Sequence, residues 1–200
     1  MPNQTPVSEP TWEIAQLFPD QGHWSEEEYL ALTTNHLVEY VNGRLEFLPM
    51  PTQSHQFLVL YLYHALFTFL TQNPVGTVLL APLRVRLWAG KHREPDVVFM
   101  LAEHEARRGE QYWDGADLVM EVISPDDRRR DLVTKRHEYA QAGIPEYWVV
   151  DPQAQQITVL ALAGKRYAEH GVFGLGETAV SPLLPGFEVE ITAVFAAANR

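Results

Sequence analysis

The stretch that decides the fold is DLVMEVISPDDRRRDLVTKRHEYAQAGIPEYWVVD, residues 117–151. Apolar runs at its two ends predict buried strands over 117–124 and 144–151. Between them, residues 128–142 have helix-forming composition, and Gly143 suits the position just after a helix. The stretch therefore predicts a strand, a helix and a second strand.

Charged residues interrupt this pattern at two places. Glu121 lies within the first apolar strand, where an ionised carboxylate is costly unless it is paired or holds a metal. Asp131, Lys135 and Tyr139 are four residues apart and share one face of the predicted helix. We expect Tyr139 to pack in the core, as aromatic residues in apolar stretches usually do. The chain thus delivers a carboxylate from a strand and a lysine from the following helix.

A second carboxylate comes from an earlier strand. Residues 94–101, EPDVVFML, predict a strand in which Pro95 takes the first position and Asp96 follows. Side chains alternate along a strand, so Asp96 and Val98 share a face, as Val119 and Glu121 do later. If the two strands are neighbours in register, Asp96 and Glu121 meet on one face of the sheet.

The N-terminal quarter contains two local signals. Residues 1–24 show no clear period and are expected to form an N-terminal arm, with residues 25–200 as a single domain. Ser25 and Glu28 have capping-box spacing, which predicts a short helix. The Asn42-Gly43 pair predicts a hairpin over 37–48 that places Glu39 opposite Glu46. Like charges facing each other are unfavourable. Either a cation lies between them or one strand is bulged, or both glutamates are solvated at an edge.

The next predicted helix is capped by Ser54 and runs to about Gln72. It is apolar nearly all round, which predicts burial on more than one side, between a sheet and a partner subunit. His55 stands at its start. It is either a capping-region histidine or a site residue directed at phosphate or water. Further strands are expected in residues 76–88, and C-terminal strands over 155–161 and 165–169, with 188–195 as the closing segment.

The composition narrows the class of protein. The absence of cysteine excludes a thiolate metal site and favours a reducing compartment. The N-terminus has no signal-peptide pattern, and the longest apolar stretch, residues 57–70, is too short to cross a bilayer. We therefore expect a cytoplasmic protein with no membrane partner.

The net charge of −11 argues against nucleic acid as a partner, but its distribution does not. Residues 84–136 hold 11 Lys/Arg and 11 Asp/Glu, so the whole excess of negative charge lies elsewhere in the chain. The cations near the predicted carboxylates are either ordinary surface charge or a DNA-binding surface. This candidate nucleic-acid-binding set consists of Lys91, Arg93, Arg128, Arg129 and Arg130.

Two carboxylates and a lysine suit the hydrolysis of phosphodiesters. That reaction uses a metal to neutralise phosphate charge and to lower the pKa of a water. Mg²⁺ prefers oxygen ligands and usually takes one or two carboxylates from the protein. Asp96 and Glu121 are the expected metal ligands, and Lys135 is the expected ammonium that positions the water.

A longer series of motifs resembles the PD-(D/E)XK nuclease superfamily, and within it the Uma-two family of restriction endonucleases. The series is listed here in chain order: Glu39 before Asn42-Gly43, Ser54-His55-Gln56, Pro95-Asp96-Val97-Val98, Glu121-Val122-Ile123-Ser124-Pro125, Asp131, Lys135, Tyr139, residues 143–148 (GIPEYW) and residues 150–152 (VDP). Its order and spacing are specific, although Pro-Asp alone is not. One position departs from the superfamily: Ile123 stands where the Glu-x-Lys element has lysine, and Lys135 takes that place from the next helix.

The resemblance implies an α/β (α+β) fold with a restriction-endonuclease-like core, a mixed sheet flanked by helices, an N-terminal hairpin and C-terminal strands. It implies a DNA endonuclease with Mg²⁺ or Mn²⁺, Glu39 as an added acidic residue of the site, and often a homodimer. The expected catalytic set is Asp96, Glu121, Lys135, Glu39 and His55. The alternative is a nucleic-acid-binding or interaction module on a nuclease fold with little catalysis.

Overall fold

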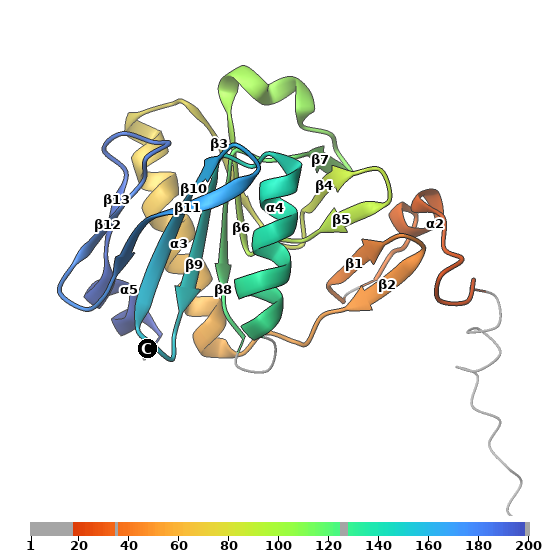
Figure 1. The fold of residues 1–200 in the computed structure, drawn as a ribbon, viewed down its shortest axis with the longest axis horizontal. Coiled ribbons are helices and arrows are strands. Elements are labelled where there is room, and N and C mark those ends of the chain that lie inside the picture. Colours follow the sequence, from red (N-terminus) through yellow and green to blue (C-terminus); the bar gives the residue numbers. More distant parts are fainter. Residues whose placement is uncertain (1–17, 35, 125–127, 199–200) are drawn as a thin grey trace, which may run out of the picture.

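A mixed six-stranded sheet forms the centre of the molecule in the computed structural model, which describes residues 18–34, 36–124 and 128–198 (Figure 1). Its strand order is β11-β10-β9-β8-β6-β3. The strands are β3 (Gly76–Leu80), β6 (Val97–Leu101), β8 (Leu118–Val122), β9 (Glu146–Asp151), β10 (Gln156–Ala163) and β11 (Arg166–Phe173). Only the β8–β9 pair is parallel among them. The stretch over 117–151 therefore supplies the two central strands, as its sequence predicts.

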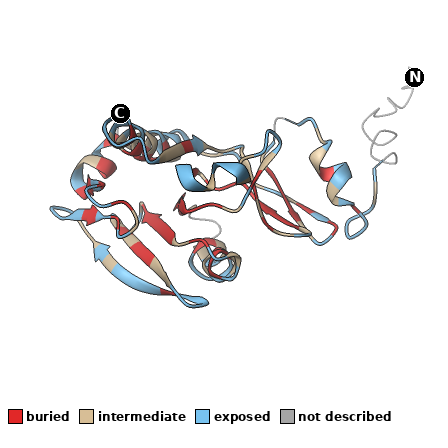
Figure 2. Cartoon of the chain, turned by 90° about the horizontal axis from the view of Figure 1, so that it is seen from above, coloured by how far each residue is buried: buried red, intermediate tan, exposed pale blue. Residues whose placement is uncertain are grey.

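Helices cover both faces of this sheet (Figure 1). Helix α3 (Gln53–Gln72) packs on one face, where Leu62 and Leu66 join inward side chains such as Phe99 and Met120. The other face carries the helical segment between β8 and β9, whose Tyr139 packs beside Val98 and Val119. Seen from above, the buried residues follow the strands between these helices (Figure 2). The alternation of apolar residues on both faces explains why β6 and β8 are buried along nearly their whole length.

The segment between β8 and β9 is helical over residues 128–142, but it is not a uniform α-helix. Residues Arg130–Lys135 (η3) form a π-helix, and α4 (Arg136–Ala142) follows without a break. Gly143 ends it in the left-handed conformation, with φ of 79°. π-helical turns inside helices are rare, and those that occur are often found at functional sites.

A second, five-stranded sheet lies beside the first and has the order β2-β1-β5-β4-β7. It contains β1 (Val38–Val41), β2 (Arg44–Phe47), β4 (Arg84–Trp88), β5 (Lys91–Arg93) and β7 (Tyr112–Asp114). The hairpin has the predicted register, with Glu39 opposite Glu46 and a turn at Asn42 and Gly43, both with positive φ. The short helix α2 (Glu26–Leu30) begins with the predicted capping box of Ser25 and Glu28 and packs on this sheet through Tyr29.

The remaining elements close the chain. A 3₁₀ helix, η1 (Ala102–Arg107), follows β6, and β12 (Thr178–Val180) pairs with β13 (Glu188–Glu190). The last element is a helix, α5 (Ile191–Ala197), which packs near α3. No helix in the described part of the chain is long and apolar enough to cross a membrane.

Two expected boundaries were wrong, those of the cap of α3 and of the strand that contains Val97. The cap of α3 is Thr52, whose hydroxyl accepts from the His55 N–H at 3.2 Å; Ser54 lies inside the helix. The closing segment over 188–195 is a strand of three residues followed by helix α5, because Glu190 caps that helix with its side chain. Strand β6 begins at Val97, so Asp96 lies just before it.

The predicted division into an arm and one domain stays a prediction. Residues 1–17 of that arm lie outside the described residues. Residues 18–24 contact the hairpin, since the N–H groups of Gly22 and Trp24 both donate to the Gly43 carbonyl.

Candidate nuclease site

The ends of β6 and β8 bring the two predicted carboxylates together. These strands pair antiparallel with Val97 opposite Met120, which places Asp96 and Glu121 at adjacent positions on the neighbouring strands. The Val122 N–H donates to Asp96 Oδ2 at 2.8 Å and fixes that carboxylate. Asp96 is about one-sixth exposed, whereas Glu121 is buried. The Asp96 carboxylate is therefore accessible to a ligand from solvent, and the Glu121 carboxylate beside it is buried.

The helical segment supplies two side chains that contact Glu121, and a third, Asp131, that contacts one of them. Lys135 Nζ lies 2.8 Å from Glu121 Oε2 and 3.2 Å from Asp131 Oδ1. The Tyr139 hydroxyl donates to Glu121 Oε1 at 2.5 Å. All four side chains are buried, and each oxygen of Glu121 thus has one protein partner. Lys135 thus contacts the carboxylates of both Glu121 and Asp131.

Burial and charge act against each other at this centre. Burial raises the pKa of Glu121, the charge of Lys135 acts against this effect, and the nearby charge of Asp96 adds to it. Burial alone would lower the pKa of Lys135, but the charge of Glu121 outweighs it and raises that pKa. The ammonium therefore stays charged at neutral pH beside a group of carboxylates that repel one another.

His55 lies on the open side of Asp96. Its Nε2 is 3.2 Å from Asp96 Oδ2, and both residues line a cavity of about 440 Å³ with largely apolar walls, such as Leu80 and Pro82. Burial lowers the pKa of His55, but the hydrogen bond and charge of Asp96 outweigh it and raise that pKa. The backbone N–H of His55 belongs to the helix cap, and its role as a site residue stays a prediction.

Glu39 does not contact the other carboxylates directly. Its Oε2 accepts from the guanidinium groups of Arg93 and Arg130, and its Oε1 accepts from the Glu94 N–H at 3.1 Å. Glu46 accepts from the same two arginines at 2.7 and 2.9 Å. A cation therefore lies between the facing glutamates, and the alternative of two solvated edge glutamates is wrong for Glu39, which is fully buried.

Charge sets the ionisation of Glu39 in turn. Burial alone would raise its pKa, but the charges of Lys135 and Arg93 lower it to about 2. Since Lys135 is among the cations that act on Glu39, the hairpin and the carboxylate centre belong to one electrostatic network. The role of Glu39 as an added acidic residue of the site stays a prediction.

The cations expected to form a DNA-binding surface separate into two groups. Lys91 and Arg93 are buried and paired with Glu138, at 2.6 Å for Lys91 Nζ and 2.8 Å for Arg93 Nε. Their expected place on an exposed surface was wrong, because β5 lies between β1 and β4 in the second sheet and both side chains pair with carboxylates there. Arg128 pairs with Asp151 at 2.5 Å.

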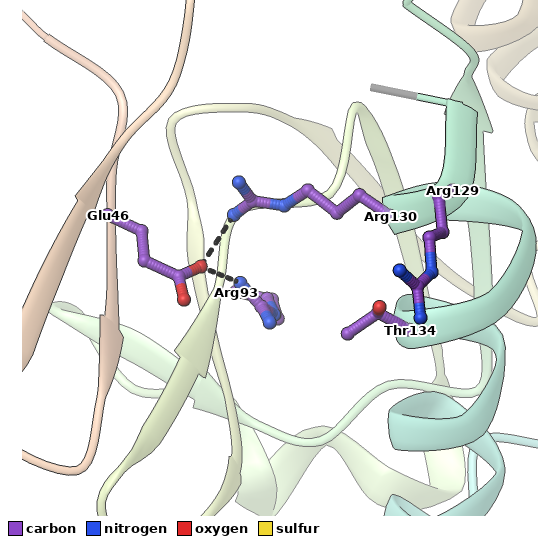
Figure 3. A pocket seen from close by; sticks show the side chains of 5 residues that line it. All are labelled: Glu46, Arg93, Arg129, Arg130 and Thr134. Atoms are coloured by element: carbon purple, nitrogen blue, oxygen red, sulfur yellow. Dashed lines mark hydrogen bonds and ion pairs between the residues drawn. The ribbon is translucent and has the colours of Figure 1, made fainter.

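Arg129 and Arg130 border open space. Arg129 is exposed, and both line a cavity of about 310 Å³ together with Arg93, Glu46 and Thr134 (Figure 3). Residues 125–127, which carry part of the quoted motif series, lie outside the described residues.

The donor set fits a hard divalent cation. Glu121 and Asp96 carry oxygen donors only, and an ionised carboxylate has about four lone-pair positions, so a metal can bind beside the existing hydrogen bonds. The described ranges contain no group of three or more His, Asp or Glu arranged for a metal. A cation held here would bind two protein carboxylates and keep water or substrate oxygens as its other ligands, which is the usual coordination of Mg²⁺ in proteins.

Sequence reasoning missed the contact of Tyr139 with Glu121. Tyr139 is in the core as expected, yet its hydroxyl also holds the candidate ligand. Its four-residue spacing from Lys135 is the signal that could have shown this, since both side chains reach the same strand. No local signal indicates that Glu138 pairs with β5.

Comparisons with known proteins agree with this geometry. The Uma2 family model, described as "Putative restriction endonuclease", matches residues 26–194, and the chain belongs to this family. Among curated proteins, none matches the chain. A crystal structure described as "a putative nuclease belonging to DUF820", from Anabaena variabilis ATCC 29413, is similar in fold, with a TM-score of 0.70 and 20% identity. The match covers 88% of this chain and 99% of that one. The expected fold class is confirmed, and family membership supports a nuclease function.

Proposed function

We propose that this protein is a metal-dependent endonuclease that hydrolyses phosphodiester bonds in DNA. The observation that carries the proposal is the convergence of Asp96, Glu121 and Lys135 at the ends of two adjacent strands. Membership of a family described as restriction endonucleases favours DNA as the substrate. The cavity beside Asp96 gives a substrate access to the more exposed carboxylate.

The proposed metal ligands are Asp96 and Glu121, with Mg²⁺ or Mn²⁺ as the ion. When bound, the metal neutralises charge on the phosphate and lowers the pKa of a water. His55 orients Asp96 through the 3.2 Å contact, and the Val122 N–H holds the same oxygen from behind. These contacts fix the carboxylate before substrate arrives, which limits the cost of organising the site.

Lys135 is proposed to position the attacking water. An ammonium has three N–H donors. Glu121 and Asp131 take two of them, which leaves the third for a water or a phosphate oxygen. Because Lys135 is buried and held at both sides, its charge acts at a fixed place on the negative charge that develops in the transition state.

Nicking of supercoiled plasmid tests the proposal. We expect nicking with Mg²⁺ or Mn²⁺, none with a chelator, and none from an Asp96→Asn variant of unchanged melting temperature. DNA binding without nicking in any of these metals would favour the interaction-module alternative. A homodimer and a cytoplasmic location stay predictions, and sedimentation of the purified protein would test the first.

A further inference from the structure

The cavity lined by Arg93, Arg129 and Arg130 lies between the N-terminal hairpin and the helical segment (Figure 3). Glu46 and Thr134 complete its walls, and its volume is about 310 Å³. Arginine keeps its charge at any physiological pH and presents planar N–H pairs that match phosphate oxygens. The Thr134 hydroxyl can add one more donor. The cavity therefore offers the groups that recognise an oxyanion.

Glu39 and Glu46, which both pair with Arg93 and Arg130, differ in how firmly they are held. Glu39 is fully buried on the inner strand β1. Glu46 comes from the edge strand β2, and its side chain is 38% exposed. A single oxygen of Glu46 accepts from both Arg93 Nη1 and Arg130 Nη2, as Figure 3 shows. Glu46 is the partly exposed member of this group, and Arg93 keeps Glu39 and Glu138 as partners when Glu46 leaves, so the loss of Glu46 costs little, whereas the loss of the buried Glu39 does not.

We propose that this cavity binds a phosphate of the nucleic-acid backbone, and that Glu46 holds the anion position in the free protein until phosphate displaces it. The carboxylate oxygen between two guanidinium groups marks where a phosphate oxygen would lie. Arg129 is exposed and faces the same space, so it supplies a further contact that the free protein leaves open to solvent.

The position of the cavity connects it to the reaction centre. Arg130 directly precedes Asp131, which contacts Lys135, and Thr134 directly precedes Lys135. A phosphate in the cavity would thus lie beside the turn that carries the lysine. The inference rests on the proposed function for the identity of the ligand as nucleic acid. Phosphate binding itself requires neither metal nor cleavage.

The test replaces the competing carboxylate and measures binding without metal. Glu46→Gln is compared with Glu169→Gln, an exposed residue on β11 that changes the net charge equally at a remote place. The probes are inorganic phosphate and a short DNA duplex, each with a chelator present. We expect Glu46→Gln to bind both about fivefold more tightly, since a weak ion pair no longer opposes the ligand. Glu169→Gln should differ from wild type by less than about twofold.

A third variant checks the location. Arg129→Gln, at an exposed position, should fold normally and should remove most of the gain when combined with Glu46→Gln. Unchanged or weaker binding by a folded Glu46→Gln protein would overturn the proposal, and so would an equal gain in Glu169→Gln. If phosphate binding increases as expected but no plasmid is nicked, the anion site stands and the nuclease assignment fails. If wild type nicks plasmid but Glu46→Gln does not bind phosphate more tightly, the nuclease assignment stands and the anion site fails.

Discussion

Replacing Glu39 by glutamine should destabilise the protein in a pH-dependent way. The pKa of Glu39 is held at about 2 in the folded protein, mainly by the charges of Lys135 and Arg93 against its burial, and its ordinary value is 4.5. At about 1.4 kcal/mol for each pH unit, this difference corresponds to roughly 3 kcal/mol of stability at pH 7. The loss of one partner from a buried ion pair typically costs a similar free energy, about 3–5 kcal/mol.

The sign follows from the lowered pKa. The stabilisation is fully present above about pH 4.5, and it is lost as the pH falls toward 2, because protonation then favours the unfolded chain. Urea unfolding at pH 7, 5, 4 and 3 should show the Glu39→Gln deficit shrink as the pH falls. Glu169→Gln serves as the matched control and should unfold like wild type. A deficit under about 1 kcal/mol at pH 7, or one that does not change with pH, would refute the reasoning that Glu39 is the fixed counterion of this network.

Three other substitutions test separate contacts. Lys135→Ala should lower single-turnover cleavage at least about a hundredfold with less than about threefold change in DNA affinity, since its effect belongs to the transition state; a parallel loss of binding would make it a phosphate contact. Tyr139→Phe removes the donor to Glu121 Oε1 and should weaken Mn²⁺ binding without unfolding the protein, so unchanged Mn²⁺ affinity would count against a positioning role. Burial, with repulsion from Glu39, raises the pKa of Glu94 to about 8, so its stability cost appears as the pH rises from 4.5 to 8. Glu94→Gln should therefore be more stable than wild type at pH 9 and equal to it at pH 4, and equal stability at both would contradict this.

Local sequence signals predicted most of the framework. The Asn42-Gly43 turn fixes the hairpin register, and with it the pairing of Glu39 and Glu46, because a two-residue turn leaves one register. Alternation along 94–101 and 117–124 placed Asp96 and Glu121 on one face, and the strands prove to be neighbours. The hairpin depends on residues that are close together in the chain, and the shared face depends on a two-residue period. Both kinds of pattern can be recognised in a sequence.

What could not be predicted depends on long-range charge pairing. Arg130 reaches Glu39 from 91 positions away, so the sequence left open which cation would separate the glutamates. Lys91 and Arg93 are charged residues of the kind expected at a surface, but β5 lies inside its sheet, and carboxylates from three other elements pair with them there. The π-helical turn also has no sequence signal here, since residues 128–142 have ordinary helix-forming composition.

Calorimetric titration with Mn²⁺ and Mg²⁺ tests the central claim that Asp96 and Glu121 form one metal site. Wild type should bind one ion per chain. Asp96→Asn and Glu121→Gln should each lose at least about tenfold in affinity while keeping the wild-type fold, because each removes one of two charged ligands. Unchanged affinity in both variants, at a wild-type melting temperature, would contradict the assignment of these carboxylates as metal ligands.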